Sequence, residues 1–153
     1  MSQKFMLIVT VLVGFLTPPV LAQDQGDPTL ADMETAKTVA ESFGTSASRL
    51  KSTLLTPQAT SLPTATKTLF FLQRLEHQSY ALANGVRHAT QNYGGVLFQS
   101  LKTRACNDVR TLIATAAASR RVCLEELGPQ TETESFMEIS RDLMDLKTIL
   151  RCN

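Results

Sequence analysis

Tryptophan is absent from this sequence, and aromatic residues of any kind make up only 6% of it. An interior with few aromatic rings has to be filled mainly by aliphatic side chains and alanine. Strict alternation of apolar and polar residues is also nearly absent, which argues against β-strands. Apolar residues instead recur at intervals of three and four almost everywhere after residue 28. The pattern therefore predicts an all-α protein.

Motifs that carry chemistry are missing as well. The sequence contains no phosphate-binding glycine loop, no Gly-x-Ser-x-Gly, no His-Glu-x-x-His and no Cys-x-x-Cys. His77 and His88 are eleven positions apart, which is about 16 Å along a helix and too far for a shared metal ion. We therefore expect a protein that is not an enzyme, with no metal site and no cofactor. The sequence assigns no binding residues.

An excess of charge of one sign is lacking too. The chain has 15 Lys and Arg against 14 Asp and Glu, and without Lys4 the two counts are 14 and 14. Nucleic acids and anionic membranes are recognised through an excess of basic residues. We therefore expect no nucleic acid partner, and the net charge gives no reason to expect an anionic membrane.

The first 22 residues, in contrast, have the form of a secretory signal. Lys4 precedes an apolar run from Met6 to Leu16, two prolines follow, and Ala22 supplies a small residue for cleavage. The run is about eleven residues long, whereas a helix across a bilayer needs roughly 20. We predict that residues 1–22 are removed and that residues 23–153 form a single secreted, extracellular domain with no stable membrane insertion. An uncleaved membrane anchor is the alternative.

Four amphipathic helices are predicted, at about 28–55, 64–93, 96–127 and 132–151. Asp27 is the expected cap of the first helix, with Pro28 in its first turn. The connections are short, which favours antiparallel neighbours and predicts an up-down-up-down four-helix bundle. An elongated pair of helical hairpins is the alternative. The sequence leaves open whether the first helix breaks at Gly44, because glycine weakens a helix interior.

The expected apolar seam of each helix follows from the same spacing. The seam positions are Met33, Ala36, Ala40, Phe43, Ala47, Leu50 and Leu54 in the first helix; Leu72, Leu75, Ser79, Leu82, Val86, Ala89 and Tyr93 in the second; Phe98, Leu101, Ala105, Val109, Leu112, Ile113, Ala116, Cys123, Leu124 and Leu127 in the third; and Phe136, Ile139, Leu143, Leu146 and Leu150 in the fourth.

Only three cysteines are present, Cys106, Cys123 and Cys152. Cys106 and Cys123 are seventeen positions apart on one predicted helix, about 25 Å, whereas the α-carbons of a disulfide lie roughly 4.4–6.8 Å apart. If the chain reverses at Pro129, Cys106 and Cys152 are level, because each is 23 residues from that proline. We therefore predict a Cys106–Cys152 disulfide. On an ideal helix Cys152 points away from the seam, so the last turn must unwind for the bond to form.

Cys123 is then left without a partner. It falls within the apolar arc of its helix, and free cysteine often packs as a small apolar side chain. We predict a buried free thiol that reacts slowly. A dimer linked through Cys123 is the alternative.

Because catalytic motifs are missing and the charge is balanced, we expect the function to be one of binding. We expect a small secreted helical protein that binds another extracellular protein without catalysis, because helical bundles present long, rigid faces to partners. The alternative is a carrier that holds an apolar small molecule or lipid in a cavity between its helices. The alanine-rich seams, Gly44 and the adaptable methionines are the features that favour a carrier.

Overall fold

The computed structural model describes residues 26–55, 66–129 and 134–153. Within these ranges the chain forms four helices and no strand: α1 (Leu30–Leu54), α3 (Thr66–Gln91), α4 (Phe98–Leu127) and α5 (Glu134–Ile149). The all-α prediction is confirmed. The predicted signal segment, the loop at 56–63 and the expected helix starts at 64 and 132 lie outside the described residues.

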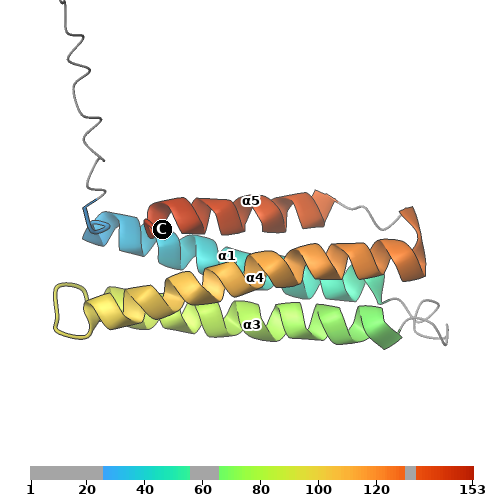
Figure 1. Ribbon diagram of the computed structural model, residues 1–153, viewed down its shortest axis with the longest axis horizontal. Helices are drawn as coiled ribbons and strands as arrows, with labels where there is room; N and C mark the ends of the chain where they lie inside the picture. The colour runs from blue at the N-terminus through green and yellow to red at the C-terminus, as the bar shows by residue number, and fades with distance from the viewer. Residues whose placement is uncertain (1–25, 56–65, 130–133) are drawn as a thin grey trace, which may run out of the picture.

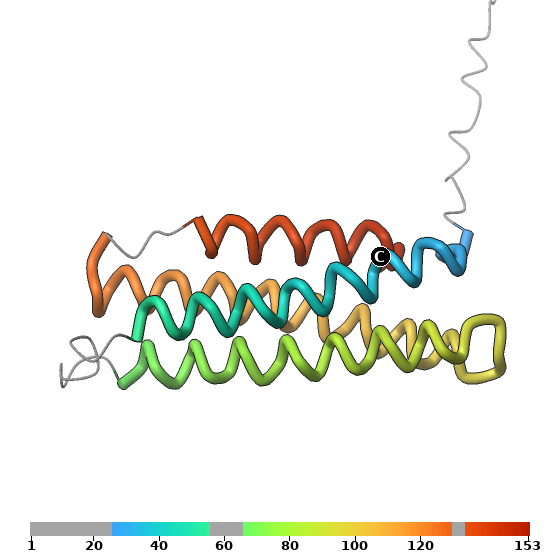
Figure 2. Tube along the Cα trace, turned by 180° about the vertical axis from the view of Figure 1, so that it is seen from behind, coloured from blue at the N-terminus to red at the C-terminus, as the bar shows by residue number. Residues whose placement is uncertain are grey.

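The four helices form a bundle in which consecutive helices run antiparallel (Figure 1). Helix α1 packs against α3 and α5, and α4 packs against the same two helices. The view from behind shows the same order (Figure 2). The up-down-up-down bundle is therefore the observed architecture. Helix α5 is the shortest of the four, with 16 residues against 30 in α4.

The predicted seams form the core. Every predicted seam residue of α1 and of the fourth helix is buried. In α3 the one exception is Tyr93, which lies beyond the end of the helix and is 39% exposed. The third seam is less completely covered, because Leu101, Ile113, Leu124 and Leu127 are only partly buried. The apolar spacing thus located the interior. Leu101, Ile113 and Leu124 lie at the margins of the α4 seam, and Leu127 is the last residue of the helix.

The start of α1 differs from the prediction. The cap is Thr29 and not Asp27: the Thr29 hydroxyl accepts a hydrogen bond from Asp32 N–H (3.1 Å), and the Asp32 carboxylate accepts one from Thr29 N–H (2.8 Å). This reciprocal pair satisfies two backbone donors at the helix start. Pro28 is buried just before the helix and not within its first turn. Asp27 instead contacts Lys102 of α4.

At three other ends the predicted helices extend two residues too far. Helix α3 ends at Gln91, α4 begins only at Phe98, and α5 ends at Ile149. Residues 92–97 therefore form a longer turn between α3 and α4 than the sequence indicated. Helix α1, in contrast, continues through Gly44 without a break.

Gly44 of α1 lies beside Tyr80 of α3. A β-carbon at this position would lie 3.6 Å from the ring of Tyr80 on α3, which is ordinary van der Waals contact. The Tyr80 ring thus lies beside Gly44 at a distance that an alanine side chain would also allow. The space beside Gly44 is filled by this ring and offers no room for a ligand.

Candidate functional site

The residues at the C-terminus form an ordered turn that ends α5. After α5, Arg151 adopts a left-handed conformation (φ 53°). Cys152 N–H donates to the carbonyl of Lys147 (2.9 Å), and Arg151 N–H donates to that of Thr148 (3.0 Å). These two bonds are the Schellman pattern, which ends a helix and turns the chain across its axis.

This turn brings Cys152 to Cys106 on α4. Their α-carbons are 5.3 Å apart, and the two sulfurs are joined in a disulfide. The pair favoured by helix register is therefore the pair that the structure places at bonding distance. The last residues have left the helix, as the register argument required, but by an ordered Schellman turn and not by fraying. Both cysteines are almost fully buried, with 6% and 8% of their surface exposed.

Polar contacts hold the chain ahead of α1 against the same end of the bundle. Lys102 Nζ lies 2.8 Å from a carboxylate oxygen of Asp27, and Gln99 donates to the other oxygen of that group. Arg151 donates to the carbonyl of Gly26 and lies 3.6 Å from Asp32. The segment from Gly26, α4 and the C-terminal turn are thus tied together.

These contacts also set the charge state of the two carboxylates. The hydrogen bond from Lys102 is the largest influence that holds the pKa of Asp27 below its ordinary value. For Asp32 the main cause of its lowered pKa is the hydrogen bond from Thr29 N–H. Both groups are therefore charged at neutral pH, and their role here is to hold chain segments together.

Cys123 lies in the core of the bundle and is the free cysteine of the structure. Burial raises the pKa of its thiol to about 11, although a hydrogen bond with Thr68 acts in the opposite direction. A protonated, inaccessible thiol is a poor nucleophile. An intermolecular disulfide through Cys123 would require the packing around it to open.

Two methionines stand on the outward side of α5. Met137 is 65% exposed and Met144 is 55% exposed. Seven residues separate them, which places them on the same side of the helix, about 10 Å apart along its axis. Arg141 and Thr148, which share this side, are exposed as well. This surface, Met137, Arg141, Met144 and Thr148, is called the α5 outer face below.

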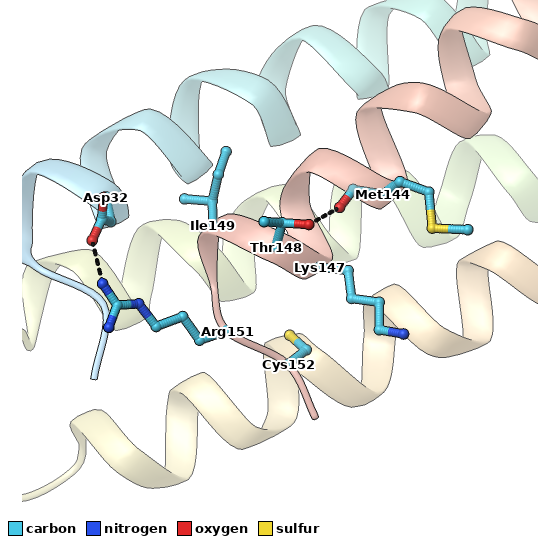
Figure 3. Close-up of a pocket in the computed structure, with 7 residues that line it drawn as sticks. All are labelled: Asp32, Met144, Lys147, Thr148, Ile149, Arg151 and Cys152. Carbon is cyan, nitrogen blue, oxygen red and sulfur yellow. Dashed lines mark hydrogen bonds and ion pairs between the residues drawn. The ribbon is translucent and has the colours of Figure 1, made fainter. Parts of the chain in front are cut away.

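A hollow adjoins the C-terminal end of the α5 outer face (Figure 3). Ile149 and Lys147 lie on different sides of α5, and the Met144 side chain extends away from Cys152. The hollow is therefore an open depression beside the last turns of α5 and not an enclosed cavity. Its charged groups suit a polar partner better than an apolar ligand. The residues that line it are Asp32, Met144, Lys147, Thr148, Ile149, Arg151 and Cys152.

A second exposed apolar surface lies in the turn between α3 and α4. Val96 is fully exposed, Leu97 is 60% exposed and Tyr93 is 39% exposed. We call these three residues the α3–α4 tip. The ring of Tyr93 packs edge-on against buried Phe98, with centroids 5.0 Å apart. The tip is therefore attached to the core at its base while its apolar side chains face outward.

Side chains that could bind a metal ion are not gathered together in the described ranges. His77 and His88 are both exposed on α3, and no cluster of three or more His, Cys, Asp or Glu side chains suited to a metal ion occurs among the residues at 26–55, 66–129 and 134–153. None of the four described helices is long and apolar enough to cross a membrane.

Sequence reasoning missed both exposed apolar surfaces, although each has a sequence signal. Met137 and Met144 are out of phase with the seam of α5, since Met137 directly follows the core residue Phe136. Val96 and Leu97 directly follow Gly94-Gly95, a pair that ends a helix. Apolar residues that fall outside a predicted seam would have identified both surfaces.

Comparison of the chain with protein-family models, with curated proteins and with solved structures finds no match. The function therefore has to be inferred from the geometry described above.

Proposed function

We propose that this protein acts outside the cell by binding another extracellular protein, without catalysis, through the α5 outer face. The observation that carries the proposal is the pair of exposed methionines, Met137 and Met144, on a single helix face. Methionine is flexible and polarizable, and it is common on surfaces that adapt to a partner. The export pattern at residues 1–22 supports the extracellular location.

The rigidity of α5 supports the same proposal. Its inner side is fixed by a fully buried seam, and the disulfide between Cys152 and Cys106 ties its C-terminal turn to α4. A face that is ordered before binding loses less conformational entropy when a partner docks. Arg141, which lies between the two methionines on this face, and Asp145, next to Met144, provide exposed charges of both signs. Methionine and arginine are both enriched in protein interfaces.

The carrier function was favoured by the alanine-rich seams, Gly44 and the methionines, and Gly44 does not support it. The ring of Tyr80 lies beside Gly44. The hollow at the end of α5 is open and bordered by Asp32, Lys147 and Arg151.

Site-specific photo-crosslinking tests the proposal. A photoreactive amino acid replaces Met144 in the secreted protein, and in a control it replaces Ala114, which is exposed on α4. In the fluid into which the protein is exported, we expect a discrete crosslinked protein with the probe at position 144 and none with the probe at position 114. Met137→Lys in the Met144 probe protein should abolish that product. Equal products from both positions, or a product insensitive to Met137→Lys, would refute the α5 outer face as the interface.

A further inference from the structure

The α3–α4 tip is an ordered structure that presents apolar side chains to solvent. Gly94 takes a left-handed conformation (φ 72°), Gly95 N–H donates to Asn92 O (2.9 Å), and Phe98 N–H donates to Gly95 O (3.0 Å). With Phe98 buried at its base, this turn holds Val96 and Leu97 away from the core. Val96 is fully exposed and Leu97 is mostly exposed, so packing of the core does not account for their apolar character.

The tip is also free of charge. Residues 89–101 contain no Asp, Glu, Lys, Arg or His. The nearest Lys or Arg on each side is already paired: Arg87 contacts Glu41 (3.0 Å) and Lys102 contacts Asp27 (2.8 Å). Moving a charged group into an apolar phase is expensive, whereas an uncharged apolar turn can enter one without that penalty. The surrounding chemistry therefore favours an apolar phase over an oppositely charged partner.

The location of the tip indicates which apolar phase it meets. The tip, the start of α1 and the C-terminus lie at the same end of the bundle, and the α3–α4 turn extends beyond the ends of α1 and α5 in both views (Figures 1 and 2). Leu30, the first residue of α1, adds a further exposed apolar side chain at this end (49%).

The apolar run at 6–16 joins the bundle at that end too. The described chain begins at Gly26, which Arg151 holds against the C-terminal turn. The nine residues from 17 to 25 span at most about 30 Å. While the signal segment is attached and engaged with the export membrane, the end of the bundle nearest to the lipid is the end that carries the tip.

We propose that the α3–α4 tip is a lipid-contact site that rests Val96 and Leu97 in the surface of a bilayer. Tyr93, with an apolar ring and a polar hydroxyl, suits the headgroup level. The contact is reversible and does not span the membrane. Because the tip carries no charge, it recognises the apolar surface of the bilayer and not the sign of its headgroups. This site is separate from the α5 outer face, so it goes beyond the proposed function.

Tryptophan fluorescence tests this site, because the natural sequence has no tryptophan. Val96→Trp places a single reporter in the tip, and Ala114→Trp places one on the outward side of α4 as a matched control. On addition of phosphatidylcholine vesicles to the secreted protein, we expect the emission of the Val96→Trp protein to shift to shorter wavelength. The emission of the Ala114→Trp protein should not change.

Vesicle co-sedimentation measures the affinity without a reporter. The double variant Val96→Asp, Leu97→Asp should bind phosphatidylcholine vesicles at least about tenfold more weakly than the natural protein, a loss equal to 1.4 kcal/mol or more. Its denaturation midpoint should be unchanged, since both side chains are exposed. The double variant Met137→Asp, Met144→Asp should bind vesicles normally, which separates this test from that of the α5 outer face.

Three outcomes would overturn the proposal. One is no binding of the natural protein at any lipid concentration. Another is binding confined to vesicles that contain phosphatidylserine and abolished by salt, which would indicate an electrostatic contact elsewhere. The third is a dimer of the natural protein that the Asp variant dissociates, because a second copy would then cover the tip.

Discussion

Glycine serves two different purposes in this chain, and the distinction decides what its replacement will do. Gly44 lies in the interior of α1 with ordinary helical geometry, and an added methyl group would meet the Tyr80 ring at a comfortable 3.6 Å. Gly94 instead occupies the left-handed region (φ 72°) in the α3–α4 turn. A residue with a β-carbon is tolerated in the first environment and strained in the second.

Gly44→Ala should therefore raise the free energy of unfolding by about 0.5–1 kcal/mol, because alanine loses less backbone entropy than glycine when a helix forms. Gly94→Ala is the matched comparison and should lower it by roughly 1–2 kcal/mol, the usual penalty for a left-handed alanine. Urea denaturation followed by circular dichroism measures both. A loss of stability in Gly44→Ala would show that the contact with Tyr80 is tighter than the structure indicates.

Pairs of helices are joined by buried or half-buried polar side chains in addition to the apolar seams. Between α1 and α3, Glu76 accepts hydrogen bonds from Lys51 and from the Ser48 hydroxyl (2.7 Å). Between α3 and α4, Glu126 accepts from both the N–H and the hydroxyl of Thr68. Such directional bonds fix which faces meet, a property that apolar packing alone specifies less strictly.

Glu76 gives the α1–α3 contact a dependence on pH. The hydrogen bond from Lys51, followed by that from Ser48, lowers the pKa of Glu76 below its ordinary value of 4.5. A lowered pKa in the folded state means that the stabilisation is present above pH 4.5 and is lost as the pH falls through the folded value. Glu76→Gln should therefore lower the free energy of unfolding at pH 7 by about 1 kcal/mol, with the difference from the natural protein vanishing in acid.

Urea denaturation at pH 7 and at pH 3 checks this expectation. Glu125→Gln is the control, because Glu125 is exposed on α4 and lies 3.9 Å from Arg121 of its own helix. This substitution should change stability little at either pH. A Glu76→Gln effect of equal size at both values would mean that charge on Glu76 has no part in joining the helices.

The helices show where sequence reasoning succeeds and where it stops. Residues such as Ile139 and Leu143 were located correctly, because burial of one helix side imposes a spacing that is visible in the chain. The cap of α1 was misplaced, since Asp27 and Thr29 are both good caps and a tertiary contact with Lys102 occupies Asp27. The left-handed turn at Arg151 has no local signal, because glycine or asparagine is usual at that position.

The candidate surfaces were harder to predict than the fold for a related reason. Periodicity identifies residues that face the core, but it does not distinguish an exposed apolar residue with a role from one without. The pairing of Cys106 with Cys152 could be predicted from the sequence, because it depends only on the rise per residue of a helix and on the position at which the chain reverses. The α3–α4 tip was missed because the third helix was predicted to begin at Val96, whereas α4 begins at Phe98 and leaves Val96 and Leu97 in the turn.

In the described part of the molecule, the segment from Gly26 and the C-terminal turn meet at one end of the bundle and are fastened there. The Cys106–Cys152 bond, the Arg151 contact with Asp32 and the Lys102 contact with Asp27 join α4, the C-terminal turn and the segment before α1. Helix α5 is the shortest element, so it has the least buried surface with which to hold itself in place. The disulfide compensates for this by closing the α4–α5 hairpin at its open end.

Removal of that bond should consequently affect α5 first. The double variant Cys106→Ser, Cys152→Ser lacks a link between residues 46 positions apart. The chain-entropy estimate for a loop of this length is a loss of about 4 kcal/mol in the free energy of unfolding. We expect a loss of that order in urea denaturation. Amide hydrogen exchange should accelerate most in α5, while the amides of α3, which α1 and α4 flank, should keep their relative protection.

Peptide mapping of the unreduced natural protein provides the matching covalent test. One cross-linked pair, Cys106 with Cys152, should be found, and alkylation of Cys123 should require denaturant because its thiol is buried and protonated. Cys123→Ala is the control, since it removes a thiol while leaving the cross-link and should lose far less than the double variant. A Cys106–Cys123 peptide would contradict the fold itself: those residues are about 25 Å apart on an unbroken α4, so the helix would have to be broken for them to bond.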